Sequence, residues 1–255
     1  MTKQTLVATR TLEPGIAQIT IQRPPVNALN ADAIWQLRSA IGTLGDDAEN
    51  QSIVLTGQGS FFSFGLDVPE ILDLTREQFS SFLREFAGLY RDIFACPKPV
   101  IAALNGHATA GGCMIAIACD HRVMAQGRAK IGLTGVRFGA GLFAGSSILL
   151  RHILGGQQAD RVAQLGDVYA ANAALEIGLV DVACAAEDVP RHASDLARKY
   201  LACDPAALTL IRQTTRAPLL AQIDATEEES LQAFVELWYS PSTRAQVEKI
   251  IIRNS

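Results

Sequence analysis

The stretch NGHATAGGCM, residues 105–114, decides the fold, because it joins a buried strand to a helix through a run of small residues. Apolar residues at 99–104 predict the strand, and the apolar run that follows, ending at Asp120, predicts the helix. The first N–H groups of a helix have no partner inside it, and the helix dipole adds partial positive charge there. The stretch therefore predicts a place for an anionic oxygen, such as that of a thioester carbonyl turning into an enolate.

The composition predicts a protein with an extensive core and a partly covered surface. The chain has 255 residues, of which 49% are apolar and only 19% are charged, and its mean hydropathy is +0.17. This length is enough to bury a large core. We expect other subunits to cover part of the apolar surface, so an oligomer is favoured over a monomer with a generous core.

Charge and motif content exclude several classes of partner. The net charge of −4 and the lack of any basic cluster argue against nucleic acid. No run reaches the roughly 18 uninterrupted apolar residues of a membrane span, and the first residues lack the apolar core of a signal peptide. The five cysteines form neither a Cys-x-x-Cys pair nor a zinc pattern, which predicts reduced, buried thiols in a cytoplasmic protein without a metal.

Periodicity predicts a mixed α/β fold up to about residue 190. Asn30 is a suitable N-cap for a first helix, and a long amphipathic helix with an aromatic stripe is expected at 76–95. Core strands are expected at 16–22, 52–56, 100–104, 122–125 and 129–133.

The second half of the chain contains a glycine-rich loop and a helical tail. The segment 132–145 is unusually rich in glycine and is predicted to be a loop that lines a site. From Val189 the chain is almost entirely helical, with separate helices expected at 207–216 and 227–238. The sequence thus predicts a mixed α/β core followed by a helical extension.

An ordered set of motifs runs through the first 181 residues. The motifs are RP at 23–24, NALN at 27–30, Gly57, FSFGLD at 62–67, PKPVIA at 97–102, NG at 105–106, AGGC at 110–113, CDHR at 119–122, IGL at 131–133 and ALEIGLVD at 174–181. Taken together, and in this order, they resemble the crotonase superfamily of enoyl-CoA hydratases and isomerases. The resemblance is greatest to the branch of mitochondrial-type Δ3,Δ2-enoyl-CoA isomerases.

The resemblance implies a fold, a ligand and an assembly. The fold would be a superhelix of ββα turns, with residues 1–190 forming the spiral core that holds an acyl-CoA site. Residues 191–255 would form a helical region that packs a homotrimer, which in this family often pairs into a hexamer. Acyl-CoA would be the substrate or ligand, and no separate cofactor is implied.

The resemblance also implies roles for individual residues. The backbone N–H groups of Leu66 and Gly111 would form an oxyanion hole around the thioester oxygen. Glycines at such places let backbone approach a ligand closely. The residues implied to contact the substrate or CoA are Asn27, Ala28, Phe64, Gly65, Asp67, Gly112, Met114 and Gly135.

The carboxylates that the family uses for proton transfer are replaced in this sequence. Hydration needs two of them, one acting on water and one on Cα, whereas a shift of the double bond needs only one. The first hydratase glutamate would fall on Met114, the isomerase base on Gly135, and a third position used in other branches near Phe143. True hydration is therefore not expected.

Three interpretations remain open. One is an isomerase-like enzyme that recruits another group, for which Glu70, Asp73 and His107 are the candidates. A second is a reaction that needs mainly the oxyanion hole, such as decarboxylation, thioester hydrolysis or C–C cleavage, and a third is acyl-CoA binding without turnover. A serine hydrolase is excluded because no Gly-x-Ser-x-Gly elbow is present, and the glycine spacing does not fit a dinucleotide site.

Overall fold

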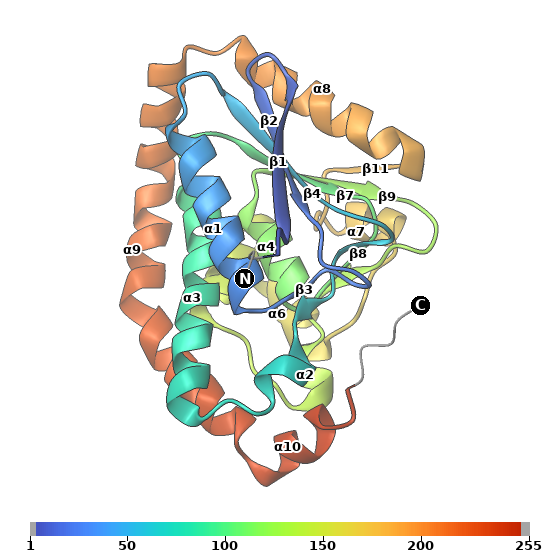
Figure 1. Ribbon diagram of the computed structural model, residues 1–255, viewed down its shortest axis with the longest axis vertical. Coiled ribbons are helices and arrows are strands. Elements are labelled where there is room, and N and C mark those ends of the chain that lie inside the picture. Colours follow the sequence, from blue (N-terminus) through green and yellow to red (C-terminus); the bar gives the residue numbers. More distant parts are fainter. Residues whose placement is uncertain (1–3, 251–255) are drawn as a thin grey trace.

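The computed structural model describes residues 4–250, and its main layer is a six-stranded sheet in the order β1-β2-β4-β7-β9-β11 (Figure 1). β1 and β2 run antiparallel, and the later neighbours pair in parallel. The strands are β1 (Val7–Glu13), β2 (Ile16–Ile21), β4 (Ser52–Gly57), β7 (Val100–Leu104), β9 (His121–Ala125) and β11 (Val182–Cys184). The strands predicted at 16–22, 52–56, 100–104 and 122–125 are confirmed to within a residue.

A second set of short strands follows the first along the chain. They form a three-stranded sheet, β10-β8-β5, and a separate pair, β3-β6. Their bounds are β3 (Ala28–Leu29), β5 (Phe61–Ser63), β6 (Gly65–Leu66), β8 (His107–Thr109) and β10 (Ile131–Gly132), the last shorter than the strand predicted at 129–133. Each of β4, β7 and β9 is followed by a short strand and then by a helix, which is the repeated ββα unit that the family resemblance implies.

The helices begin where the sequence supplies a cap. Asn30 caps α1, because its Oδ1 accepts a hydrogen bond from the N–H of Ala33 at 3.0 Å. Thr75 and Gln78 form a capping box at the start of α3, which ends where the sequence predicts. The helices are α1 (Ala31–Asp46), α2 (Val68–Ile71), α3 (Arg76–Ala95), α4 (Gly111–Ala118), α5 (Ala144–Leu154), α6 (Gly156–Leu165), α7 (Ala171–Glu176), α8 (Val189–Leu201), α9 (Pro205–Trp238) and α10 (Pro241–Val247), with 3-10 turns η1 (Gly135–Phe138) and η2 (Ala186–Asp188).

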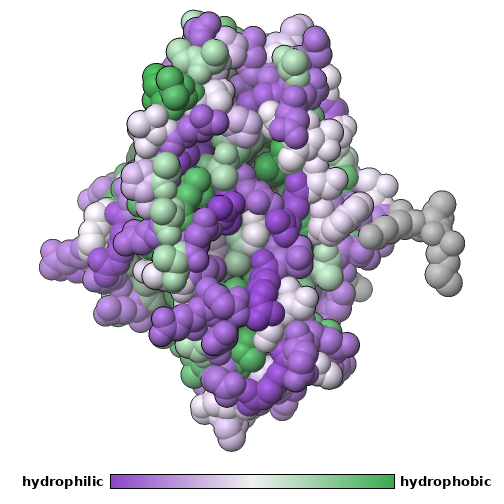
Figure 2. Space-filling model, turned by 90° about the vertical axis from the view of Figure 1, so that its left-hand side faces the viewer, coloured by the Kyte–Doolittle hydropathy of each residue, from purple (hydrophilic) through white to green (hydrophobic). Residues whose placement is uncertain are grey.

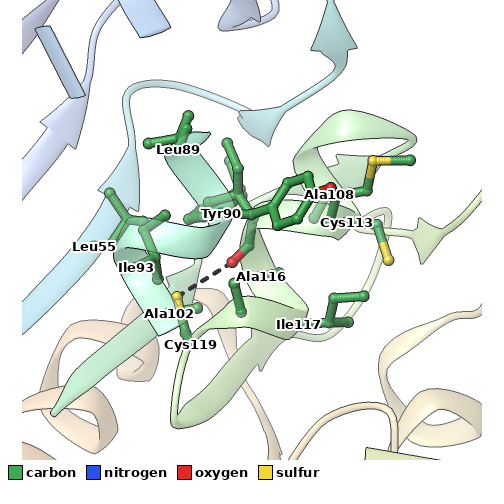
Figure 3. Packing of buried hydrophobic residues seen from close by; sticks show 14 of the residues in the cluster. Leu55, Leu89, Tyr90, Ile93, Ala102, Ala108, Cys113, Ala116, Ile117 and Cys119 are labelled. Carbon is green, nitrogen blue, oxygen red and sulfur yellow. Dashed lines mark hydrogen bonds between the residues drawn. The ribbon is translucent and has the colours of Figure 1, made fainter. Parts of the chain in front are cut away.

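Helix α4 lies in the centre of the hydrophobic core. All eight of its residues are buried, and it packs against α3. Figure 3 shows side chains of α4, such as Cys113 and Ala116, meeting Tyr90 and Ile93 of α3 and Ala102 of β7. Because α4 is enclosed on all sides, its first turn is held firmly in place.

The C-terminal region is dominated by α9, which runs along one edge of the molecule beside α3 (Figure 1). The two separate helices expected at 207–216 and 227–238 are one helix that continues through Pro218. Buried residues of α9 on both sides of Pro218, among them Arg212 and Ile223, fix the helix in the fold, so tertiary contacts outweigh the hydrogen bond that the proline removes. Exposed ion pairs such as Arg91–Asp224 and Arg84–Glu228 also join α9 to α3. The face that α9 presents is mostly hydrophilic, with scattered apolar patches (Figure 2).

A buried charge cluster fastens α9 to the sheet. The carboxylate of Asp120 accepts hydrogen bonds from the guanidinium groups of Arg212 and Arg216, and also from the N–H of Val100 at 2.8 Å. Burial alone would raise the pKa of Asp120, but the two guanidinium groups hold that pKa below its usual value. The carboxylate therefore stays ionised and anchors the helix.

Candidate active site

Two turns of the chain meet in direct contact at Gly65 and Gly111. Gly65 has a φ of +109°, a conformation that residues with a side chain rarely adopt. A Cβ at position 65 would stand 2.8 Å from the nitrogen of Gly111 and 3.0 Å from the carbonyl oxygen of Thr109. Only glycine fits here, and its absence of a side chain lets β6 lie against the first turn of α4.

The N–H groups of Leu66 and Gly111 are not used by the regular backbone bonding around them. Asp67 donates its N–H across the β3–β6 pair to Leu29 at 3.0 Å, so the preceding N–H, on Leu66, points away from β3. The first bond within α4 runs from Met114 to Ala110 at 3.1 Å, which leaves Gly111 without an acceptor inside the helix. A Cβ on Gly111 would lie 3.3 Å from the nitrogen of Leu66, so the two donors are close neighbours.

Short contacts behind the two donors fix their positions. The Ser63 hydroxyl donates to the carbonyl oxygen of Asn27 at 2.8 Å and accepts from the N–H of Gly65 at 3.1 Å. A Cβ on Gly112 would come within 2.1 Å of the carbonyl oxygen of Ser63. Ala110, immediately before α4, has a φ of +48°, which is a strained conformation for a residue with a side chain.

Both donors line one deep, apolar pocket of about 560 Å³. It lies between the first turns of α2 and α4 and the wall formed by η1, the loop after it and α9. The lining residues are Phe64, Leu66, Val68, Ile71, Phe86, Thr109, Ala110, Gly111, Met114, Leu133, Thr134, Gly135, Val136, Phe138, Ala140, Gly141, Leu142, Phe143, Ala163, Gln164, Phe234, Trp238 and Ile250. The glycine-rich segment 132–145 therefore lines a site, as its composition predicts.

The pocket wall carries no ionisable side chain in the part of the chain that the structure describes. The three positions expected to lack a carboxylate, Met114, Gly135 and Phe143, all contribute to this wall. Its polar side chains are neutral, and one of them is already engaged, since the Thr109 hydroxyl donates to the carbonyl oxygen of Phe64 at 3.0 Å. The pocket can stabilise charge on an oxygen through backbone N–H groups, but its own side chains cannot carry a proton near neutral pH.

The three alternative bases lie outside this pocket. Glu70 forms an ion pair with Arg23 at 2.9 Å and accepts hydrogen bonds from Asn30, while Asp73 is exposed on the surface. His107 is half-buried with its ring against Phe61, and burial, with a contribution from Lys130, lowers its pKa. None of the three candidates lines the pocket that contains the two donors.

Four of the residues expected to contact the substrate or CoA lie behind the turn that carries Leu66, and their contact with CoA stays a prediction. Asn27 and Ala28 are buried, and the Asn27 side chain donates to backbone carbonyls on either side of the turn before β5. Asp67 caps α2 and pairs with Arg23 at 2.6 Å, and Gly112 packs on Ser63. These residues do not line the pocket, although they shape the turn that carries Leu66.

The sequence did not identify the aromatic side chains that line the pocket. Phe86 of α3 lies beside Gly111, whose Cβ would stand 3.1 Å from the Phe86 ring, and Phe234 and Trp238 of α9 line the pocket as well. The only signal was the spacing of Leu231, Phe234, Val235 and Trp238 at intervals of three and four, which marks a buried face. Such spacing shows that a helix face is covered, but not what it covers.

One buried titratable pair lies next to the pocket without reaching it. The Tyr90 hydroxyl donates to the carboxylate of Glu227, which also accepts the N–H of Gly145 at the start of α5. Burial raises the pKa of Tyr90 and also that of Glu227. The Tyr90 ring contacts Phe86, which separates the pair from the pocket lining.

Within residues 4–250, no three His, Cys, Asp or Glu side chains come together as a metal site requires. No helix in that same range has the length and apolar character needed to cross a bilayer.

Comparison with known proteins places this geometry in a family. Residues 11–253 match the family model described as enoyl-CoA hydratase/isomerase. The chain is 30% identical over 239 residues to a probable enoyl-CoA hydratase of Bacillus subtilis, covering 92% of each. It is 25% identical over 241 residues to enoyl-CoA delta isomerase 1, mitochondrial, of Homo sapiens, covering 94% of this chain and 80% of the relative.

Structural similarity agrees with these matches. The crystal structure of human mitochondrial Δ3-Δ2-enoyl-CoA isomerase matches the chain with a TM-score of 0.90 at 25% identity, covering 96% of each. The resemblance inferred from the motifs, to the crotonase superfamily and its isomerase branch, is therefore confirmed, as is the mixed α/β fold with a helical C-terminal region.

Proposed function

The chain belongs to the enoyl-CoA hydratase/isomerase family, and we propose that it binds an acyl-CoA thioester with the carbonyl oxygen between the N–H groups of Leu66 and Gly111. The observation that carries this proposal is the pair of unused donors beside each other at the edge of a single apolar pocket. Donors fixed in a site without water stabilise negative charge on oxygen far better than water-exposed donors do.

The proposed chemistry is isomerase-like in proceeding through a thioester enolate, but the protein supplies only the stabilisation of the oxyanion. Polarisation of the carbonyl acidifies the C–H bond at C2, and because no side chain of the lining can accept this proton, it would pass to a water molecule in the pocket. The electron pair of the broken C–H bond then gives an enolate whose negative charge lies on the oxygen held by the two N–H groups. The apolar wall provides no carboxylate to take up or return a proton. Hydration, which needs two such groups, does not fit this site.

A second candidate function is binding of acyl-CoA without turnover. It is favoured by the same wall, since no ionisable side chain among residues 4–250 lines the pocket. The two candidates share the oxyanion hole and differ only in whether a proton moves. Met114 and Gly135 both line the pocket, so either position could be given a carboxylate.

Calorimetry with a matched pair of ligands tests the shared step. Octanoyl-CoA and the thioether S-octyl-CoA differ only in the carbonyl oxygen. Two net hydrogen bonds are worth about 1–3 kcal/mol, so we expect the thioester to bind about tenfold to hundredfold more tightly. Equal affinities, or no affinity for either ligand, would contradict the proposed oxyanion hole.

Restoring a carboxylate tests whether only the base is missing. Met114 lies three residues after Gly111, on the same face of α4, and lines the pocket. In Met114→Glu the apolar surroundings should raise the pKa of the new carboxyl group and suit it to proton transfer. We expect turnover of 2- or 3-enoyl-CoA about a hundredfold above that of the matched control Met114→Gln, since a placed base contributes about that much.

Position 135 provides an independent version of the same experiment. A Cβ at position 135 would stand 3.2 Å from the carbonyl oxygen of Gly141, so Gly135→Glu requires a small shift of the backbone around Gly141. Gly135→Ala requires the same shift without adding a carboxylate and is therefore the control. No gain of isomerase activity at either position, on 3-enoyl-CoA of several chain lengths, would count against an isomerase-shaped pocket. Conversion by the unaltered protein that is lost on neutralising Glu70, Asp73 or His107 would instead restore the first of the three interpretations.

A further inference from the structure

The pocket that holds the two donors is also lined by the aromatic side chains of Phe143, Phe234 and Trp238. We propose that it selects an acyl chain of about eight to twelve carbons, and that Phe143, Phe234 and Trp238 stop the chain at its far end. This inference rests on the proposed acyl-CoA binding and adds to it the class of acyl group.

The volume sets the length. A methylene group takes up about the space of a water molecule, roughly 30 Å³, so 560 Å³ corresponds to about 19 such groups. The thioester and the adjoining part of the CoA arm take up some of this space, and ligands do not fill a pocket completely. About eight to twelve carbons remain for the acyl chain.

The aromatic wall is packed from both sides. The rings of Phe143 and Phe234 lie 4.6 Å apart between centroids, and Trp238 stacks on Phe79 of α3 at 4.8 Å. The exposed fractions of Phe143, Phe234 and Trp238 are only 1%, 7% and 2%. A wall supported in this way has no free space into which a longer chain could push it.

The loop that carries Phe143 is held at both ends by the C-terminal helices. At one end, the carboxylate of Glu227 accepts the N–H of Gly145, and the hydroxyl of Ser230 accepts the N–H of Ala144 at 2.9 Å. At the other end, the Thr243 hydroxyl donates to the carbonyl oxygen of Gly139 at 2.8 Å. These contacts oppose retreat of the loop, so the limit on chain length should be sharp.

Calorimetry with saturated acyl-CoAs of 4 to 16 carbons tests the inference. Each buried methylene should tighten binding about fourfold, from a burial energy of about 0.8 kcal/mol, until the chain meets the wall. Beyond about twelve carbons, the affinity should stop rising or fall.

Variants of the wall should move that limit. We expect Phe234→Leu and Phe143→Leu, which open space at the end, to extend the limit by about two carbons. The matched control is Phe94→Leu, which shortens a buried aromatic of α3 that does not line the pocket. It should cost stability in a similar way and leave the limit unchanged.

The outcomes separate this inference from the proposed function. An affinity that does not depend on chain length, or a limit that stays in place in both wall variants, overturns the inference while the thioester still binds more tightly than the thioether. If no acyl-CoA binds at any length, the proposed function itself fails. A limit that moves equally in Phe94→Leu shows a general loosening of the fold and also overturns the role of the wall.

Discussion

One side of the pocket is formed by backbone groups and the other by side chains. On one side, the donors of Leu66 and Gly111 belong to the backbone, and Gly65 and Gly112 leave no room for a Cβ. On the opposite side, η1, the loop after it and α9 present side chains, all of them without charge. The backbone side resists substitution, whereas the side-chain side could accept many residues.

This difference separates two functions of the pocket. Polarisation of a carbonyl needs only backbone N–H groups at fixed positions, which the glycine contacts provide. Movement of a proton and choice of acyl chain depend on side chains, which come from the other wall. A protein of this fold can therefore keep the ability to polarise a carbonyl, while the side chains of the other wall determine a different reaction or a different acyl group.

The largest expected effect comes from placing a side chain on the backbone side, in Gly65→Ala. The positive φ costs about 1–3 kcal/mol, and the overlap with the nitrogen of Gly111 adds about as much. The separation of the two donors should also change. We expect the variant to lose the preference for octanoyl-CoA over S-octyl-CoA, measured by calorimetry, together with stability measured by chemical denaturation.

Gly59→Ala is the matched control for this substitution. Gly59 has a φ of +75°, but a Cβ there would meet nothing within 4 Å, so the variant carries the backbone strain without the overlap. It should lose some stability and keep the full preference for the thioester. If Gly65→Ala binds the two ligands with the unaltered ratio, the contact between β6 and α4 does not position the donors.

The same contrast explains how far the sequence alone could lead. The backbone side lies within two short motifs, FSFGLD and AGGC, in which the glycines and their spacing already indicate a close approach. The choice of Leu66 and Gly111 came from the resemblance of these motifs to the family, and both residues line the pocket. The helix at 76–95 and the strand at 100–104 were predictable because their patterns are local.

The side-chain wall could not be predicted in this way. Phe86, Phe143 and Phe234 are far apart in sequence and meet only because α3, α5 and α9 pack together. Their periodicity shows burial, and burial in a core or beside a ligand produces the same pattern. The expectation of two helices at 207–216 and 227–238 was wrong for a related reason, since burial of residues on both sides of Pro218 outweighs a local preference.

A smaller effect is expected when the side-chain wall loses its anchor, in Asp120→Asn. The buried guanidinium groups of Arg212 and Arg216 would lose the charge that they surround, which should cost about 3 kcal/mol of unfolding free energy. Because α9 carries Phe234 and Trp238, we expect the affinity for acyl-CoA to level off less sharply with chain length. The preference for octanoyl-CoA over S-octyl-CoA should change less. Asp224→Asn is the control on the same helix, since its exposed pair with Arg91 should contribute at most about 1 kcal/mol.

Acid should remove the same contribution from the unaltered protein. The pKa of Asp120 is lowered in the folded state, so its stabilising effect is complete above the pKa of the unfolded chain, about 3.9. The effect is lost as the pH falls below that value toward the folded pKa. In denaturation between pH 7 and pH 3, the gap between the protein and Asp120→Asn should be constant above about pH 5 and should narrow below pH 4. A constant gap down to pH 3 would show that this carboxylate does not anchor α9.

The smallest expected effect concerns the reactivity of the thiols around α4. It tests whether the helix that carries the Gly111 N–H stays packed in the core. Burial raises the pKa of Cys113 to about 12 and also raises that of Cys119, whose thiol donates to the carbonyl oxygen of Ile115 (Figure 3). Cys203 is exposed, so in the native protein at pH 8 an aromatic disulfide reagent should label it quickly and Cys113 and Cys119 hardly at all.

Cys203→Ser should then abolish the fast phase of labelling, while denaturant should expose the remaining thiols. In Gly65→Ala, where the first turn of α4 is displaced, labelling of Cys113 should become measurably faster, because that residue lies two positions after Gly111. Asp120→Asn should leave Cys113 protected. Rapid labelling of Cys113 in the unaltered protein would mean that α4 opens readily, and a helix that opens readily cannot hold the Gly111 N–H at a fixed distance from that of Leu66.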